Sequence, residues 1–161
     1  MDAARNGIAG LLAGRRAVVV GVGNSLCADD GAGPYVARRL AAEHPGRALD
    51  AGTVPENHLG VVLERAPEVV LFVDAVDHGG APGDWCVVPV WEAEARVSFT
   101  HAASLRLAAT LLESEGAACW LVGIQPACLE PGRAMGAAVR ESADRLAAVL
   151  ARALAGEPIH A

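Results

Sequence analysis

The chain has 161 residues, of which 53% are hydrophobic, and its formal net charge is −6. This length suits one domain with a substantial core, and the composition excludes a disordered or low-complexity protein. The acidic balance argues against nucleic-acid binding, and no apolar run reaches the roughly 20 residues that span a bilayer. We therefore expect residues 1–161 to form one domain that neither binds nucleic acid nor inserts into a membrane.

The chain alternates short apolar runs with amphipathic segments. Residues 1–15 are predicted to form an N-terminal arm or a short helix, because the first strand follows them at once. The further elements, in chain order, are predicted as strand 17–20, helix 34–43, strand 48–50, helix 55–65, strand 69–73, strand 85–90, a loop, helix 101–114, strand 118–124 and helix 135–154.

The connection between the strands at 69–73 and 85–90 is too short for a helical crossover. The second of these strands should therefore run antiparallel to the rest and lie at an edge, where Pro89 is tolerated. The alternation of the other elements favours parallel pairing with helices on both faces. The predicted fold is α/β: a three-layer sandwich around a five-stranded, mostly parallel twisted sheet with one antiparallel strand.

The four cysteines contain no C-x-x-C pair, so zinc-site spacing is absent. We expect free thiols in a cytoplasmic protein, because a reducing cytosol keeps buried cysteines unpaired. Cys27 differs from the others because it lies inside an acidic loop. Whether Cys27 or His78 touches a site stays open.

That acidic loop belongs to the stretch AVVVGVGNSLCADDGAG, residues 17–33. Its glycines invite comparison with a dinucleotide-binding turn. However, Leu26 stands where the third glycine is needed, and two aspartates stand where a pyrophosphate requires amide donors. The loop instead places carboxylates at the carboxyl end of a strand, where open α/β sheets carry their ligands.

Polar side chains follow several of the predicted strands. Asp29 and Asp30 follow the first strand, Asp74 follows residues 69–73, and His101 begins a helix. Two carboxylates and an imidazole at one sheet edge would form a site for nickel or zinc. Each residue also has a purely structural interpretation: Asp29 in a turn, Asp74 as a cap, and His101 as a surface histidine.

Several separate blocks of the chain resemble one family. The blocks are GVGNSLCADDGAGP, FVDAVDHGGAPGD and FTHAASL, together with PEN at residues 55–57 and VGIQP at residues 122–126. In order and spacing they resemble the hydrogenase maturation endopeptidases. PEN and VGIQP look most like the branch that serves formate-hydrogenlyase-type enzymes, the hydrogenase 3 branch.

The resemblance implies metal-contacting catalytic residues at Asp30, Asp74 and His101. It also implies an endopeptidase that removes the C-terminal extension of a nickel–iron hydrogenase large-subunit precursor after nickel insertion. The nickel would come with the precursor, and other divalent metals could occupy the site. We expect metal-assisted attack by water, with Asp29 or Asp77 assisting as a base, in a monomeric protein.

Two other functions stay open at this point. The first is a chaperone without catalytic activity that senses nickel on its partner. The second is a metallohydrolase with a resident divalent metal and a small substrate. A fold shared by many functions does not decide among the three.

Overall fold

The sheet has the predicted number and directions of strands. In a computed structural model that describes residues 2–156, five strands lie in the order β2-β1-β3-β5-β4. Their bounds are β1 Ala17–Gly21, β2 Ala48–Asp50, β3 Val69–Ala75, β4 Trp85–Pro89 and β5 Ala118–Ile124. The pairs β1–β2, β1–β3 and β3–β5 are parallel, and β4 pairs antiparallel with β5 at the edge. The prediction of four parallel strands and one antiparallel edge strand is confirmed.

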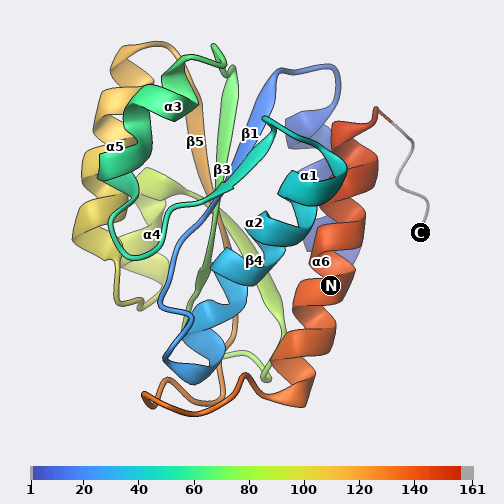
Figure 1. Cartoon of the computed structure of the whole chain (residues 1–161), viewed down its shortest axis with the longest axis vertical. Helices are drawn as coiled ribbons and strands as arrows, with labels where there is room; N and C mark the ends of the chain where they lie inside the picture. Colours follow the sequence, from blue (N-terminus) through green and yellow to red (C-terminus); the bar gives the residue numbers. More distant parts are fainter. Residues whose placement is uncertain (1, 157–161) are drawn as a thin grey trace.

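Helices cover both faces of this sheet (Figure 1). One layer holds α1 Asp2–Leu12, α2 Ala32–Glu43 and α6 Ala137–Leu154, and the other holds α3 Leu59–Leu63, α4 Val90–Arg96 and α5 Ala102–Ser114. A hydrophobic core lies between the sheet and each helix layer, and alternate residues of β3 point into the two cores. Val69 and Leu71 face the first layer, while Val70 and Phe72 face the second. Because both faces are covered, the central strands are apolar throughout rather than alternating with polar residues.

The N-terminal segment is a packed helix rather than an arm. Ile8 and Leu12 on α1 are buried in the same core as α6. Their i, i+4 spacing gives the helix a narrow apolar stripe. Met1, the first residue of the predicted segment, lies outside the described residues. Within residues 2–156, no helix is both long and apolar enough to cross a membrane.

Several predicted boundaries differ from the structure, three of them near functional or connecting segments. The helix expected over residues 55–65 consists of a 3-10 turn, η2 Pro55–His58, followed by α3. Strand β3 extends through Ala75, so that Asp74 lies within the strand rather than after it. The last helix, α6, begins at Ala137 instead of Met135, after the N-cap Gly136.

The segment after β4 forms a helix where a loop was predicted. Pro89 ends β4 and precedes α4, whose buried residues Val90 and Ala93 are spaced at i, i+3. Glu92 and Arg96 form an i, i+4 ion pair with 2.6 Å between their charged groups. Both spacings are helical. The segment spans less than two turns, and such short helices depend on tertiary packing more than on sequence propensity.

Candidate functional site

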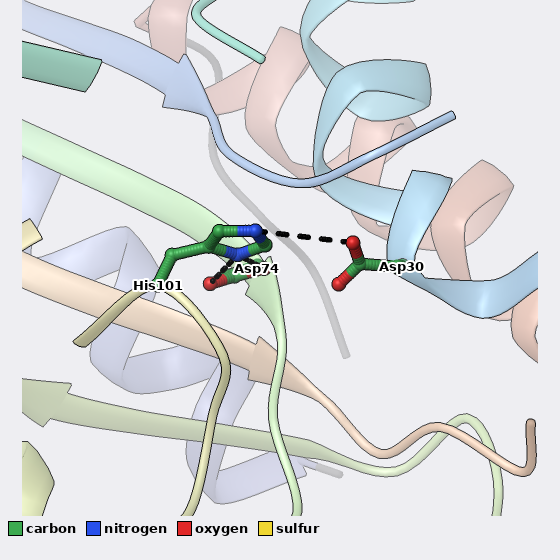
Figure 2. A group of neighbouring side chains, drawn as sticks. All are labelled: Asp30, Asp74 and His101. Atoms are coloured by element: carbon green, nitrogen blue, oxygen red, sulfur yellow. Dashed lines mark hydrogen bonds and ion pairs between the residues drawn. The ribbon is translucent and has the colours of Figure 1, made fainter. Parts of the chain in front are cut away.

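Three side chains from three segments converge at the carboxyl edge of the sheet (Figure 2). Asp30 comes from the 3-10 turn η1 (Ala28–Gly31), Asp74 from β3, and His101 from the N-cap of α5. Each offers one ligand atom, and these atoms all lie within 4.8 Å of one another. The exposed fractions are 6%, 0% and 8%, so all three are buried.

The imidazole of His101 lies between the two carboxylates, one ring nitrogen toward each (Figure 2). Its Nδ1 is 3.2 Å from Asp74 Oδ2 and 3.4 Å from Asp74 Oδ1. Its Nε2 is 3.9 Å from Asp30 Oδ2. Contact of one ring nitrogen with a carboxylate orients the other nitrogen, as in metal-ligating histidines.

The loop before α2 holds Asp30 in place by close backbone packing. Gly23 has a φ of +136°, and a Cβ there would lie 1.9 Å from the carbonyl oxygen of Asp30. The backbone N–H of Asn24 then donates to Asp30 Oδ2 at 2.8 Å. Gly33, in the first turn of α2, approaches β3 so closely that a Cβ would lie 2.1 Å from the Val73 carbonyl oxygen. Only glycine permits these two approaches.

Burial and like charge shape the electrostatics. Burial raises the pKa of Asp74 from its ordinary 3.8 to about 6; the nearby Asp30 adds to this rise, and contact with His101 opposes it. The pKa of His101 is raised mainly by its contact with Asp74, while burial acts in the opposite direction. A cation beside these groups would relieve the repulsion between the two carboxylates.

The free acceptor of Asp30 supports a cation site. Its Oδ2 accepts the Asn24 N–H bond, but its Oδ1 is buried and has no hydrogen-bond partner among residues 2–156. A buried carboxylate oxygen without a partner is costly, so it requires an explanation. Two carboxylates and one imidazole form a donor set that suits nickel or zinc and leaves coordination positions open. The residues present therefore fit a divalent metal.

Asp29 points elsewhere, although it adjoins Asp30. It lies outside the three-residue group and is fully buried. Its Oδ2 accepts from the backbone N–H groups of Ala127 and Cys128 at 2.8 and 3.0 Å, and its Oδ1 accepts from Gly136 at 2.7 Å. These bonds tie the turn η1 to the segment between β5 and α6. They favour a positioning role over the predicted role as a base.

Asp77 also lies outside the three-residue group. It is exposed, and its Oδ1 accepts from the Gly79 N–H and from the side-chain amide of Gln125. Cys27 and His78 lie outside the three-residue group as well. Cys27 is a free thiol, and His78 Nε2 lies 3.3 Å from the Asp84 carbonyl oxygen. The expectation of free thiols is confirmed for all four cysteines.

Sequence reasoning missed the role of Gln125. It follows β5 directly and is 7% exposed. Its Oε1 accepts from the backbone N–H groups of His78 and Gly80, and its Nε2 donates to Asp77. Gln125 thereby anchors the loop that leaves β3 just after Asp74. The signal was available, since a polar residue directly after an apolar strand is the pattern that singled out Asp74.

Comparison with known proteins identifies the family. Residues 34–153 match the family model described as HycI, hydrogenase maturation protease. The chain belongs to the hydrogenase maturation protease family. The matched range includes Asp74 and His101 and begins shortly after Asp30. The resemblance on which the sequence analysis relied is confirmed.

Individual maturation proteases support this membership. The hydrogenase 3 maturation protease of Escherichia coli K12 is 37% identical over 112 residues, covering 68% of this chain and 72% of that protein. The crystal structure of HycI from Thermococcus kodakarensis superposes with a TM-score of 0.83 at 30% identity, covering 92% of this chain and 98% of that one. The solution structure of the endopeptidase HycI from E. coli gives 0.72 at 30% identity, covering 84% and 88%.

Proposed function

We propose that this protease is an endopeptidase that removes the C-terminal extension of a nickel–iron hydrogenase large-subunit precursor once nickel is inserted. The observation that carries the proposal is the buried group Asp30, Asp74 and His101, at the strand ends of a fold shared with named maturation proteases. The similarity to the E. coli hydrogenase 3 enzyme supports the hydrogenase 3 branch.

In this proposal nickel is part of the substrate. Asp30 and Asp74 provide carboxylate oxygens and His101 an imidazole nitrogen, so the precursor's nickel meets three ligands held by three separate segments. The carboxylate of Asp74 orients His101 through Nδ1, and the Asn24 N–H orients Asp30 and leaves its Oδ1 free. A divalent ion held by these three residues would supply Lewis-acid chemistry, which polarises a carbonyl and activates water.

The three side chains include no hydroxyl or thiol, which favours water as the nucleophile over a covalent intermediate. Burial of the group excludes most solvent, so the electrostatic interactions with a reacting peptide bond are strong. Asp29 is occupied by three backbone N–H groups and contributes by holding the loop. Other divalent metals that match the donor set would compete for the site.

A cleavage assay with nickel-loaded and nickel-free precursor, run side by side, tests the proposal. The wild-type protein should cleave only the nickel-loaded form. Asp30→Ala, Asp74→Ala and His101→Ala should leave it uncleaved while their circular-dichroism spectra stay native. Glu141→Ala is the control, because that carboxylate is exposed on α6 and lies outside the group. Equal cleavage of both precursor forms would contradict nickel recognition.

The same preparation separates the two other functions. A chaperone would bind the nickel-loaded precursor and leave it intact. A metallohydrolase with a resident metal would contain about one equivalent of metal after purification, whereas the proposed protease should hold little before its substrate arrives. We also propose that residues 1–161 act as one monomeric, cytoplasmic protease domain, for which size-exclusion chromatography tests the oligomeric state.

A further inference from the structure

A small basic cavity adjoins the loop that carries Asp30. Its volume is about 180 Å³, and three arginines from three segments line it: Arg38 on α2, Arg133 in the segment between β5 and α6, and Arg140 on α6. Ser25 and Gly31 of the Asp30 loop also line it. The Asp30 loop and the segment between β5 and α6 lie at the same end of the molecule, the lower end in Figure 1. A concentration of positive charge is unexpected on a chain with a net charge of −6.

The positive charge of this cavity is only partly balanced. Arg38 pairs with Asp50 at 2.9 Å and Arg133 pairs with Glu130 at 3.1 Å. The remaining nearby carboxylate, on Asp144, accepts from the Tyr35 hydroxyl at 2.6 Å and pairs with Arg39. Of the three arginines that line the cavity, Arg38 and Arg133 each have an ion pair within residues 2–156, and Arg140 has none there.

Arg140 is held in place by an aromatic ring, and within residues 2–156 it forms no ion pair with a carboxylate. Its guanidinium lies 4.0 Å from the centre of the Tyr35 ring, which is a close cation–π contact. The charge of Arg140 also acts on Asp144, but the ion pair of Asp144 within residues 2–156 is with Arg39. The stacked guanidinium is therefore preorganised and keeps its hydrogen-bond donors available.

The cavity is coupled to the candidate site by covalent structure. Ser25, Ala28 and Gly31 line it, and Asp30 lies between the last two of these in the chain. The bonds from Asp29 to Ala127 and Gly136 fix the opposite wall, which carries Arg133 and begins α6. The loop that carries Asp30 therefore also forms one wall of this cavity.

We propose that this cavity binds an acidic side chain of the precursor and thereby positions the polypeptide at the site; the inference rests on the proposed function. The planar guanidinium donates paired hydrogen bonds that match a carboxylate. The net charge of −6 disfavours binding of an acidic segment elsewhere on the chain, so the cavity would also fix the position of such a segment.

The test compares two arginine variants on α6. Arg140→Gln should raise KM for nickel-loaded precursor about tenfold with kcat unchanged, since one hydrogen-bonded charge pair is lost. The matched control is Arg145→Gln, because Arg145 is exposed on the same helix, outside the cavity, and pairs with Glu141 at 4.0 Å. Arg140→Lys should recover part of the loss. Arg133→Gln, on the other wall, should repeat the KM effect without touching the stack on Tyr35.

Changes in the precursor identify the group that is bound. Replacing the acidic residues near the cleavage position with their amides, one at a time, should raise the wild-type KM at one position. That change should have no further effect on Arg140→Gln, which is the signature of a direct pair. If only amidation of the C-terminal carboxylate raises KM, or if Arg140→Gln behaves like Arg145→Gln, the inference is overturned. Absence of cleavage by wild-type protein would instead count against the proposed function.

Discussion

Asp29 gives the sharpest test of how the site is built. Its carboxylate accepts three backbone N–H bonds, at 2.7, 2.8 and 3.0 Å, from the segment between β5 and α6. A hydrogen bond to a charged group contributes about 1.5–3 kcal/mol, and the lower end applies here because these bonds are only partly buried. Asp29→Ala, which removes all three bonds, should therefore lower the free energy of unfolding by about 4–5 kcal/mol.

Asp29→Asn should have a smaller effect, because its amide oxygen can still accept from Ala127 and Cys128 while its NH₂ faces Gly136. The loss of one bond corresponds to about 1–2 kcal/mol. For a chain of this size, each kcal/mol shifts Tm by about 2–4 °C. Thermal unfolding should therefore rank the proteins in the order wild type, Asp29→Asn, Asp29→Ala, with Glu141→Gln as an exposed control that leaves Tm unchanged.

Kinetics separate positioning from catalysis. Below the Tm of the variant, Asp29→Asn should retain kcat within about tenfold, because a general base contributes about 10²–10⁴-fold and Asp29 is not expected to be one. A fall in kcat of more than about 10²-fold at unchanged Tm would identify Asp29 as the base. An unchanged Tm for Asp29→Ala would contradict the stabilising role of its bonds to the segment between β5 and α6.

Two further predictions concern Asp74 and Gly33. Asp74 has a higher pKa in the folded chain, about 6, than its ordinary 3.8, so the folded state binds the extra proton between these values and stability falls as pH rises through this range. The raised pKa of His101 acts in the same direction above pH 6.5, so metal-free protein should lose about 1–2 kcal/mol between pH 5 and 8 in urea titrations. Asp74→Asn should flatten that slope, and a persistent slope would contradict the assignment. Gly33→Ala should unfold the protein or lower its Tm by more than 10 °C, since its Cβ would meet the Val73 carbonyl at 2.1 Å, whereas Gly60→Ala, which has open space, should not.

The main features of the fold and of the site followed from the sequence. Apolar runs marked the longer strands, and the short link between β3 and β4 predicted the antiparallel edge. Because parallel strands end at one edge, polar residues at those ends, Asp30 and Asp74, were expected to meet His101. Local pattern was sufficient wherever a residue's role depends on the position of its own strand or helix.

Features that depend on distant partners were not predictable in this way. Asp29 and Asp30 are both acidic and adjacent, and only the fold shows that Asp29 serves backbone groups about 100 positions away. Arg140 has the sequence pattern of any charged residue on a solvated helix face, and its contact with Tyr35 requires α2 and α6 to pack together. The helix α4 was missed because it is stabilised by packing of two residues rather than by a long pattern.

The adjacent aspartates Asp29 and Asp30 face two different parts of the molecule. Asp30 faces Asp74 and His101, where its unpartnered oxygen suits a cation, while Asp29 faces the segment that carries Arg133 and leads to Arg140. One short turn thus connects the acidic group that we propose for the precursor's nickel with the basic cavity that we propose for a carboxylate. A partner that presents nickel and an acidic side chain at the right separation satisfies both, whereas a free metal ion or an acidic peptide alone satisfies one. Recognition of this kind would explain how a protease with a small, buried metal site acts on a specific precursor rather than on proteins in general.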